Sequence, residues 1–360
     1  MKLLFTFPAL LMLMTSSLVD AQDAPAPEAR RDFRYAVTVI DDATVYSDLQ
    51  VPLPRFLNQV LVEPNLTFRY KPTWSFSTSL VGVADRYTDT FTQLRVKETY
   101  AGISAGDFDF TLGRRIVRWG TGYAFTATGV LDPPRIPTNP TDRLNLNEGR
   151  DMVKADYVHG PHALSVAWSS AALAPVSANL HDTTAFRYNV LVRGFDTSLI
   201  AGDDRGGDAF GGLTFTRVLG EAWEIHGEGA WREHEAILLG GKYTTPKGVT
   251  FIGEFFTPPN IPYYQDETLY PLAGRQHYLF INAGKNRLRE LPGWKEWDLS
   301  ASAVANLNDR SFTAIFDATR RFGNRFSVYM HMEVPAGSSK SEYGATPYSA
   351  ATSLGVRFQL

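Results

Sequence analysis

The chain has 360 residues and contains no cysteine. This absence excludes a disulfide scaffold, thiolate metal sites and cysteine-based catalysis. A strong charge of one sign is also missing. The formal net charge of -3 is too small, and of the wrong sign, for a nucleic-acid binder. Aromatic residues, by contrast, make up 13% of the chain, which also holds 29 glycines and 21 prolines.

Long apolar runs are scarce, and the one clear example lies at the N-terminus. Lys2 precedes the apolar stretch from Leu3 to Met14, and Val19-Asp20-Ala21 follows as a small-x-small site. This pattern predicts a signal peptide over residues 1–21, cleaved near Ala21. The stretch is too short for a transmembrane anchor, and no later run approaches the roughly 18 residues that a spanning helix needs.

Much of the chain instead shows alternation of apolar and polar residues. In the segment 60–70 one face is apolar and the other polar: Val60, Val62, Leu66, Phe68 and Tyr70 against Glu63, Asn65, Thr67 and Arg69. Similar alternation occurs around 33–39, 186–193, 223–232 and 325–333. A period of two residues predicts β-strands. It leaves two architectures open, a soluble sandwich array and a membrane barrel.

Loop length decides between them, because short and long connections alternate along the chain. Tight turns are predicted near residues 71–72, 106–107, 160–161, 194–195, 219–220, 246–247 and 322–323. Long connections are predicted at 42–57, 120–149, 172–183, 258–274 and 335–349. Short periplasmic turns with longer external loops are typical of outer-membrane barrels. The segment 286–295 is longer than this rule predicts for a periplasmic turn.

Two further patterns favour a barrel. Many predicted strand ends carry rings, as membrane-interface girdles do: Tyr70, Trp74, Trp119, Tyr123, Trp168, Trp223, Trp231 and Trp297. The last residues alternate up to the carboxylate, with Val356, Phe358 and Leu360 on one face. This ending resembles the terminal-strand signal that the bacterial barrel-assembly machinery reads.

We therefore predict an all-β fold, a transmembrane antiparallel up-and-down β-barrel of about 18 strands, with about 16 as the alternative. Closure is required because an open sheet edge would leave amides unpaired in hydrocarbon. Residues 22–32 are predicted to be a periplasmic segment and 33–360 the barrel. The expected location is the outer membrane of a Gram-negative cell.

The third external loop, 120–149, is unusually long and rich in apolar residues. Loops of this length are usually functional or disordered, and its apolar content argues against disorder. We expect it to fold into the barrel mouth and narrow it; the alternative is a lid over the outside. Its charged residues would then lie at or near the constriction: Asp132, Arg135, Asp142, Arg143 and Glu148.

Three arginines precede this loop, Arg114, Arg115 and Arg118. Arg114 and Arg115 are adjacent, so strict alternation would turn one toward lipid at a cost of about 2–4 kcal/mol at the midplane. Either a bulge at Gly113 turns both inward, or the pair lies near the rim.

Four wall residues are predicted to line the pore: Arg187, Glu224, His226 and Glu228. His226 and its two glutamates allow a metal site or acid–base chemistry, but lumen lining is favoured. Because no catalytic motif is present, we assign no catalytic residue, cofactor or metal, and expect no enzyme.

The run from Gly113 to Tyr123 carries a resemblance. Gly113, Arg114, Trp119, Gly120, Gly122 and Tyr123, followed by Asp132, Pro133 and Pro134, are similar to the motif of a poorly characterised group of Gram-negative outer-membrane barrels. Such proteins are described as porin-like or as exporters. The resemblance implies a barrel without established catalytic residues, and the alginate-exporter-like barrels are a more distant analogy.

These features predict a porin-like channel for passive diffusion of small solutes, constricted by an inward-folded loop. The alternative is an export or uptake barrel for a larger polymer or hydrophobic compound, working with periplasmic partners. Expected partners are outer-membrane lipid and lipopolysaccharide, the barrel-assembly machinery, a small-molecule solute and further copies of the chain in a trimer; nucleic acid is not expected.

Overall fold

The structure is a computed structural model that describes residues 31–51, 54–70, 73–85, 91–140, 142–173, 182–204, 208–232, 235–258, 276–288 and 293–360. The predicted signal peptide, and residues 22–30 of the predicted periplasmic segment, lie outside the described residues. In the described part of the chain, no helix is long and apolar enough to cross a membrane.

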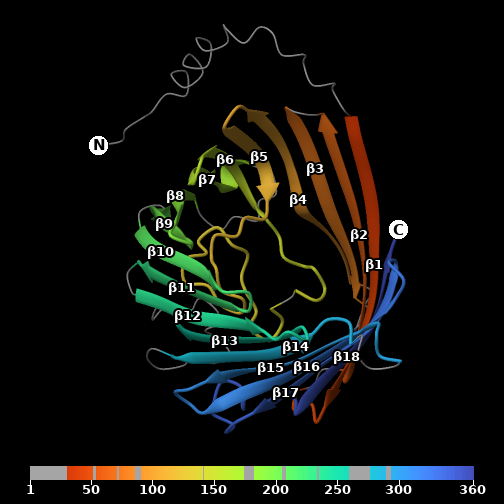
Figure 1. Cartoon of the computed structure of the whole chain (residues 1–360). Helices are drawn as coiled ribbons and strands as arrows, with labels where there is room; N and C mark the ends of the chain where they lie inside the picture. Colours follow the sequence, from red (N-terminus) through yellow and green to blue (C-terminus); the bar gives the residue numbers. More distant parts are fainter. Residues whose placement is uncertain are drawn as a thin grey trace, which may run out of the picture.

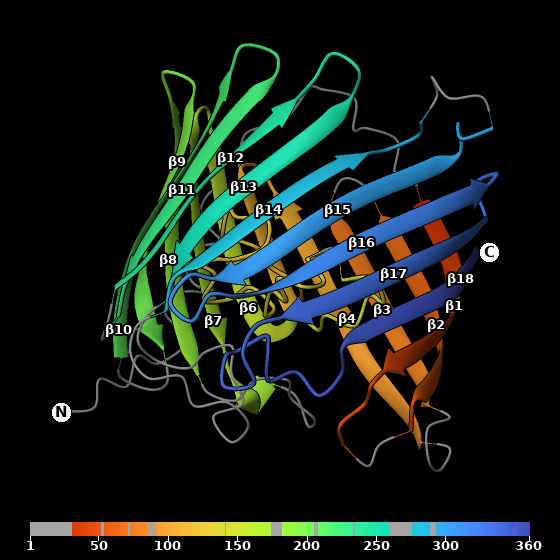
Figure 2. The same ribbon diagram turned by 90° about the horizontal axis from the view of Figure 1, so that it is seen from below.

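The described residues form one closed sheet of 18 antiparallel strands (Figure 1). The strands are β1 (Arg31–Ser47), β2 (Phe56–Tyr70), β3 (Trp74–Asp85), β4 (Phe91–Ala105), β5 (Phe108–Arg115), β6 (Arg150–His159), β7 (His162–Ser169), β8 (Thr183–Val192), β9 (Phe195–Asp204), β10 (Asp208–Leu219), β11 (Trp223–Trp231), β12 (Glu235–Thr244), β13 (Val249–Thr257), β14 (Tyr278–Lys285), β15 (Trp297–Asn306), β16 (Ser311–Phe322), β17 (Phe326–Ala336) and β18 (Ala350–Gln359). Each strand pairs with the next, and β1 pairs with β18 from Thr38↔Gln359 to Ser47↔Ala350. The strands are tilted relative to the barrel axis (Figure 2). The prediction of an all-β barrel of about 18 strands is confirmed.

Alternating side chains explain why this sheet suits a membrane. On β11, Trp223 and Trp231 are 54% and 60% exposed on the outer face, whereas His226 and Glu228 between them are 1% and 3% exposed. An apolar outer band with a polar interior is the arrangement that a barrel needs in lipid.

Glycine closes the tight turns between strands. Six of these turns carry a glycine with positive φ: Gly106, Gly160, Gly194, Gly220, Gly248 and Gly323. Gly293, also at positive φ, lies in the longer connection between β14 and β15. A side chain is strongly disfavoured in this left-handed conformation, so glycine marks the turn. The longer connections run on the opposite rim, where β1 extends to Ser47 and shortens the loop predicted at 42–57 to residues 48–55.

Candidate functional site: the loop inside the barrel

The connection between β5 and β6, residues 116–149, lies inside the ring of strands (Figure 1). Its path begins in the wall, because β5 has only 8 residues and Arg114 pairs with Thr99, near the middle of β4. Where β5 stops, the Gly149 N–H donates to the Lys97 carbonyl at 2.9 Å. The chain therefore leaves the sheet at mid-height and enters the lumen.

A glycine with φ of +122° stands at this departure point, Gly113. A Cβ there would lie 2.3 Å from the Thr99 carbonyl oxygen. The irregularity of register lies on the neighbouring strand, where Lys97 is the extra residue between pairs Leu80↔Val96 and Ser79↔Glu98. The register is continuous through Gly113 itself, so the bulge expected there is not found and the irregularity lies at Lys97 on β4. β5 ends within the wall, and not at the rim.

Three apolar contacts hold the loop against the wall. Trp119 and Leu131 pack on β6–β10, and Phe125 packs on β12–β16. Leu144 and Leu146 pack on β1–β3 and β17. The wall residues that they meet point inward and include Met152, Ile200 and Phe210, then Leu238, Phe256 and Phe280, and finally Ile40, Leu61 and Val81. The loop thus contacts most of the circumference of the barrel.

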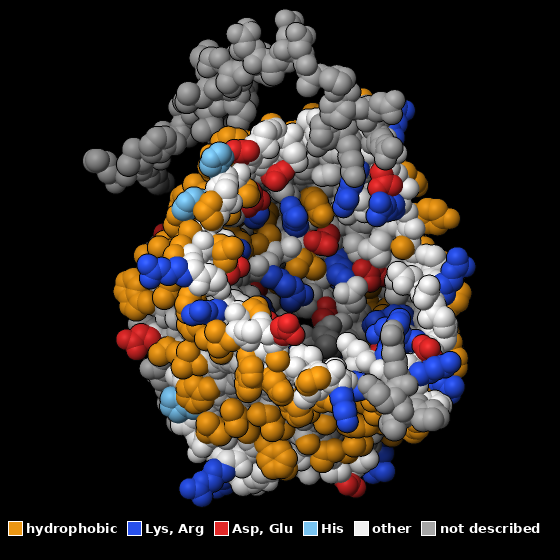
Figure 3. All heavy atoms as spheres, viewed as in Figure 1, with side chains coloured by type: hydrophobic (Ala, Val, Ile, Leu, Met, Phe, Trp, Pro, Cys, Tyr) orange, Lys and Arg blue, Asp and Glu red, His pale blue; other side chains and the backbone are white. Residues whose placement is uncertain are grey.

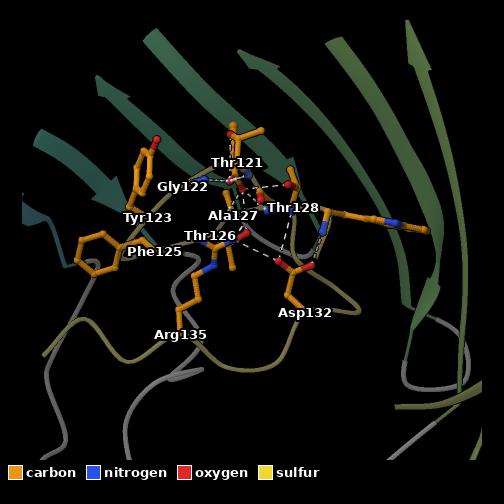
Figure 4. Close-up of polar contacts among 12 residues, drawn as sticks. Thr121, Gly122, Tyr123, Phe125, Thr126, Ala127, Thr128, Asp132 and Arg135 are labelled. Carbon is orange, nitrogen blue, oxygen red and sulfur yellow. Dashed lines mark hydrogen bonds and ion pairs between the residues drawn. The ribbon is translucent and has the colours of Figure 1, made fainter. Parts of the chain in front are cut away.

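The carboxylate of Glu228 on β11 accepts seven hydrogen bonds from the first turn of the loop, whose donor residues are labelled in Figure 4. Its donors are the N–H groups of Thr121 (2.5 Å), Gly122 (2.8 Å), Ala127 (2.7 Å) and Thr128 (2.9 Å), and the hydroxyls of Thr121, Thr126 and Thr128. Successive backbone N–H groups around one anion form a strong binding concavity. Here the anion belongs to the protein, so Glu228 anchors the loop.

A second wall carboxylate, Glu254 on β13, anchors the next residues. It accepts hydrogen bonds from the N–H groups of Tyr123, Ala124 (2.8 Å) and Phe125 (3.3 Å). His226 Nε2 lies 3.0 Å from the same carboxylate. His226 is therefore a support for Glu254 and does not line open lumen.

Glycine at two loop positions allows this wrapping. A Cβ at Gly120 would lie 2.0 Å from the Thr126 hydroxyl, and one at Gly122 would lie 2.3 Å from the Phe125 carbonyl oxygen. The Trp-Gly-Thr-Gly sequence is thus needed for a tight backbone path around the two carboxylates.

Tyr123 extends the anchored turn toward the wall. Its hydroxyl donates to Glu224 at 2.8 Å, and Lys242 Nζ lies 3.2 Å from the same oxygen. Burial raises the pKa of the Tyr123 phenol, so the group stays a neutral donor. Glu224 therefore belongs with Glu228 and Glu254 in holding the loop.

Asp132 closes the turn from within the loop (Figure 4). Its carboxylate accepts the N–H groups of Trp119 (2.7 Å) and Gly120 (3.3 Å), and Arg135 lies 3.4 Å away. Burial raises the pKa of this carboxyl above its ordinary value. Arg135 also donates to the Gly120 carbonyl at 3.0 Å, so both residues brace the loop itself.

The last part of the loop is fixed by Asp142 and Arg143. Asp142 accepts the N–H groups of Leu146 and Asn147, each at 2.9 Å. Arg143 forms an ion pair with Asp42 on β1, which is 2% exposed, and its guanidinium carbon lies 5.5 Å from the centre of the Tyr329 ring.

The charged residues at the root of the loop separate into two groups. Arg114 is 7% exposed and binds Asp151 through two hydrogen bonds of 3.0 and 2.8 Å, with Glu148 3.8 Å away. Arg115 donates to Thr111 at 2.9 Å. Arg118, in contrast, is exposed and joins none of these contacts in the described structure.

The prediction that Trp119 and Tyr123 belong to the membrane-interface girdle is wrong. Trp119 is 3% exposed inside the barrel, and Tyr123 lies in the lumen. Arg187, on β8, donates to Ser198 at 3.0 Å; it forms no hydrogen bond with the described residues of the loop and interacts with Asp132 only electrostatically. The predicted site lacked Glu254 and Asp42. Each of them contacts a loop residue more than 100 positions away in the sequence, so no local sequence pattern indicates the contact.

Beside the part of the loop that Glu228 and Glu254 anchor, an open cavity of about 860 Å³ remains. Tyr123, Arg143 and Asn145 of the loop border it on one side. On the other side it is lined by residues of β1 and of the strands from β12 to β18. One end of the barrel is visibly hollowed, with basic and acidic side chains around the hollow (Figure 3). The loop therefore fills part of the lumen and leaves a polar space beside it.

No protein-family model and no curated protein matches the chain. Solved structures do match its fold. Acinetobacter baumannii OccAB1 is 8% identical with a TM-score of 0.63, covering 92% of this chain and 98% of its own. Pseudomonas aeruginosa OprD is 10% identical with a TM-score of 0.62, covering 95% and 99%. Pseudomonas aeruginosa OccK3 (OpdO) is 8% identical with a TM-score of 0.61, covering 91% and 96%.

These neighbours are Gram-negative outer-membrane porins. The narrower resemblance drawn from Gly113 to Pro134 stays a prediction. At this level of identity the similarity concerns architecture, and the chain has the fold of an outer-membrane porin.

Proposed function

We propose that the chain is a passive outer-membrane channel for small solutes and that the loop 116–149 sets its width. One observation carries the proposal: the loop is bound inside the lumen by Glu228 and Glu254 while a cavity of about 860 Å³ stays open beside it. The porin fold and the apolar outer face support the membrane setting.

In this proposal the predicted site residues have two roles. Asp142 and Arg143 border the cavity and form the constriction together with Lys242 from the wall. Glu224, His226, Glu228, Asp132 and Arg135 hold the loop in position. Solute passes between the loop and the strands from β12 to β18.

Export of a larger polymer is a weaker proposal. It requires the loop to leave the lumen, and the seven hydrogen bonds to Glu228 together with three apolar contacts oppose such movement. The solved structures named above are porins, which supports a channel over an enzyme.

We also propose the usual surroundings of such a barrel. The outward Phe358 near the end of β18 is 39% exposed and supports recognition by the barrel-assembly machinery. Contact with lipopolysaccharide on the apolar outer face, and assembly into a trimer, belong to the same proposal.

Single-channel recording in planar bilayers tests the function. Purified wild type should give discrete conductance steps, and a variant lacking residues 126–147 should conduct several times more current because the lumen is cleared. A wild type that is folded, as judged by heat-modifiable migration on a gel, yet passes no current would overturn the proposal.

A further inference from the structure

The cavity beneath the loop is lined by charges of both signs in equal number. Three lining residues are basic and three are acidic: Arg143, Lys242 and Arg357, and Asp142, Asp298 and Asp317. Whether such charges act on a solute depends on whether the protein already neutralises them. Each of the six has a protein partner.

On the basic side, Arg143 is paired with the buried Asp42. Lys242 lies 3.8 Å from Glu224 and 3.2 Å from the hydroxyl of Tyr123. Both cations therefore face a carboxylate of the barrel wall, and neither needs a solute anion for compensation.

On the acidic side, Asp298 forms an ion pair with Arg321 at 2.5 Å. Asp317 lies 2.7 Å from His331 Nδ1. These pairs lie on β15, β16 and β17, so both carboxylates already have a partner in the wall, although His331 is shared with Glu333 at 2.9 Å.

Two lining charges lack an ion pair, and they have opposite signs. Arg357 donates to the carbonyl of Arg143 at 2.6 Å. Asp142 accepts two backbone N–H groups of its own loop. Both lie next to Arg143, so their fields largely cancel at the distance of a solute.

Some uncharged polar side chains of the same cavity, in contrast, are free. Five of them form no side-chain hydrogen bond with any described residue: Thr38, Asn286, Thr319, Ser327 and Gln359. Hydroxyls and amides supply both donors and acceptors. The groups available to a solute are therefore the neutral ones.

We infer that this cavity favours uncharged, hydroxyl-rich solutes of the size of a small sugar, an inference that rests on the channel function proposed above. A charged solute loses hydration on entry and meets charges that are already paired. A neutral polyol exchanges hydrogen bonds with water for hydrogen bonds with free hydroxyls and amides, at little net cost.

Three probes with one carbon skeleton test the inference: glucose, gluconate and glucosamine. In swelling assays with proteoliposomes, glucose should enter at least as fast as either charged probe. In planar bilayers under a KCl gradient, the reversal potential should stay close to zero. Entry of gluconate or glucosamine several times faster than glucose, or a strongly selective reversal potential, would overturn the inference.

Substitutions test whether the free hydroxyls of the cavity cause the preference for glucose. The double variant Thr38→Val, Thr319→Val keeps the shape of the cavity and removes two free hydroxyls. Glucose entry should slow by about threefold to tenfold per hydroxyl, the range of one net hydrogen bond, while KCl conductance is kept. Thr197→Val is the matched control, because Thr197 lies on β9 and does not line the cavity. Unchanged glucose entry in the double variant would contradict the inference.

A charge variant tests whether the reversal potential responds when one ion pair of the cavity lining is broken. Asp298→Asn leaves Arg321 without its carboxylate and should shift the reversal potential toward anion selectivity. If this variant shows no shift, the lining charges are not what sets selectivity and the inference fails. A folded wild type that passes neither ions nor any probe would instead overturn the channel proposal itself.

Discussion

Glu228 is the residue on which the position of the loop depends most. The carboxylate is 3% exposed and accepts four backbone N–H groups and three hydroxyls. In Glu228→Gln, an NH2 group replaces one acceptor oxygen, so several donors lose their partner, each at about 1–3 kcal/mol. We expect larger and noisier single-channel conductance. Glu221→Gln, an exposed position on the same hairpin, is the control, and an identical trace in both variants would refute the anchoring role.

Asp132 gives a dependence on pH. Burial raises the pKa of its carboxyl in the folded loop above the ordinary value of 3.8. Its contribution to stability is therefore fully present below the unfolded pKa and is lost as pH rises through the folded pKa. Asp132→Asn removes this loss. The difference in melting temperature, variant minus wild type, should be more positive at about pH 7 than at about pH 4; a difference independent of pH would contradict the assignment.

Gly122 tests the tight backbone path. A Cβ there would lie 2.3 Å from the Phe125 carbonyl and 2.7 Å from Leu238 Cδ1. Gly122→Ala should displace the loop and make it more susceptible to protease in detergent. Gly211→Ala is the control, since a Cβ at Gly211 meets nothing within 4 Å. Equal cleavage of the two variants would show that Gly122 is not required.

At the scale of elements, the ion pair between Arg143 and Asp42 fixes the end of the loop separately from the turn at Glu228. Arg143 compensates Asp42, which is 2% exposed. Removing one partner of a buried ion pair costs roughly 3–5 kcal/mol. Arg143→Ala should therefore free the segment 142–147 while the turn at Glu228 stays bound, which protease cleavage restricted to that segment would reveal. Arg118→Ala, an exposed arginine of the same loop, should leave the cleavage pattern unchanged.

The strands were predictable from sequence, and the loop was predictable only in part. Alternation records which side of the sheet a residue faces, so Trp223 and Glu228 could be assigned from neighbours alone. The contacts of Trp119 depend instead on Met152 and Phe210, which belong to other strands. Ile40 and Leu61 point inward and are apolar, although a period of two predicts polar residues there. These breaks in the pattern are the docking surface of the loop.

At the scale of the whole molecule, the loop connects parts of the wall that do not pair with one another. It packs on β1–β3, on β6–β10 and on β12–β16. Deleting residues 126–147 should therefore lower the melting temperature of the barrel while its β-sheet signal in circular dichroism is kept. A melting temperature equal to that of the wild type would show that the wall is stable without this internal support.

The separation between the loop and its anchors along the chain also imposes an order of assembly. Thr121 and Glu228 are 107 residues apart, and Ala124 and Glu254 are 130 residues apart. Contacts between distant residues form late because the entropy of closing a long segment must be offset first. The two carboxylates acquire fixed positions only when the hairpins of β11, β12 and β13 have paired. We therefore expect the loop to dock only after this part of the wall has formed, so that the lumen is wide at first and is narrowed by the anchoring of the loop.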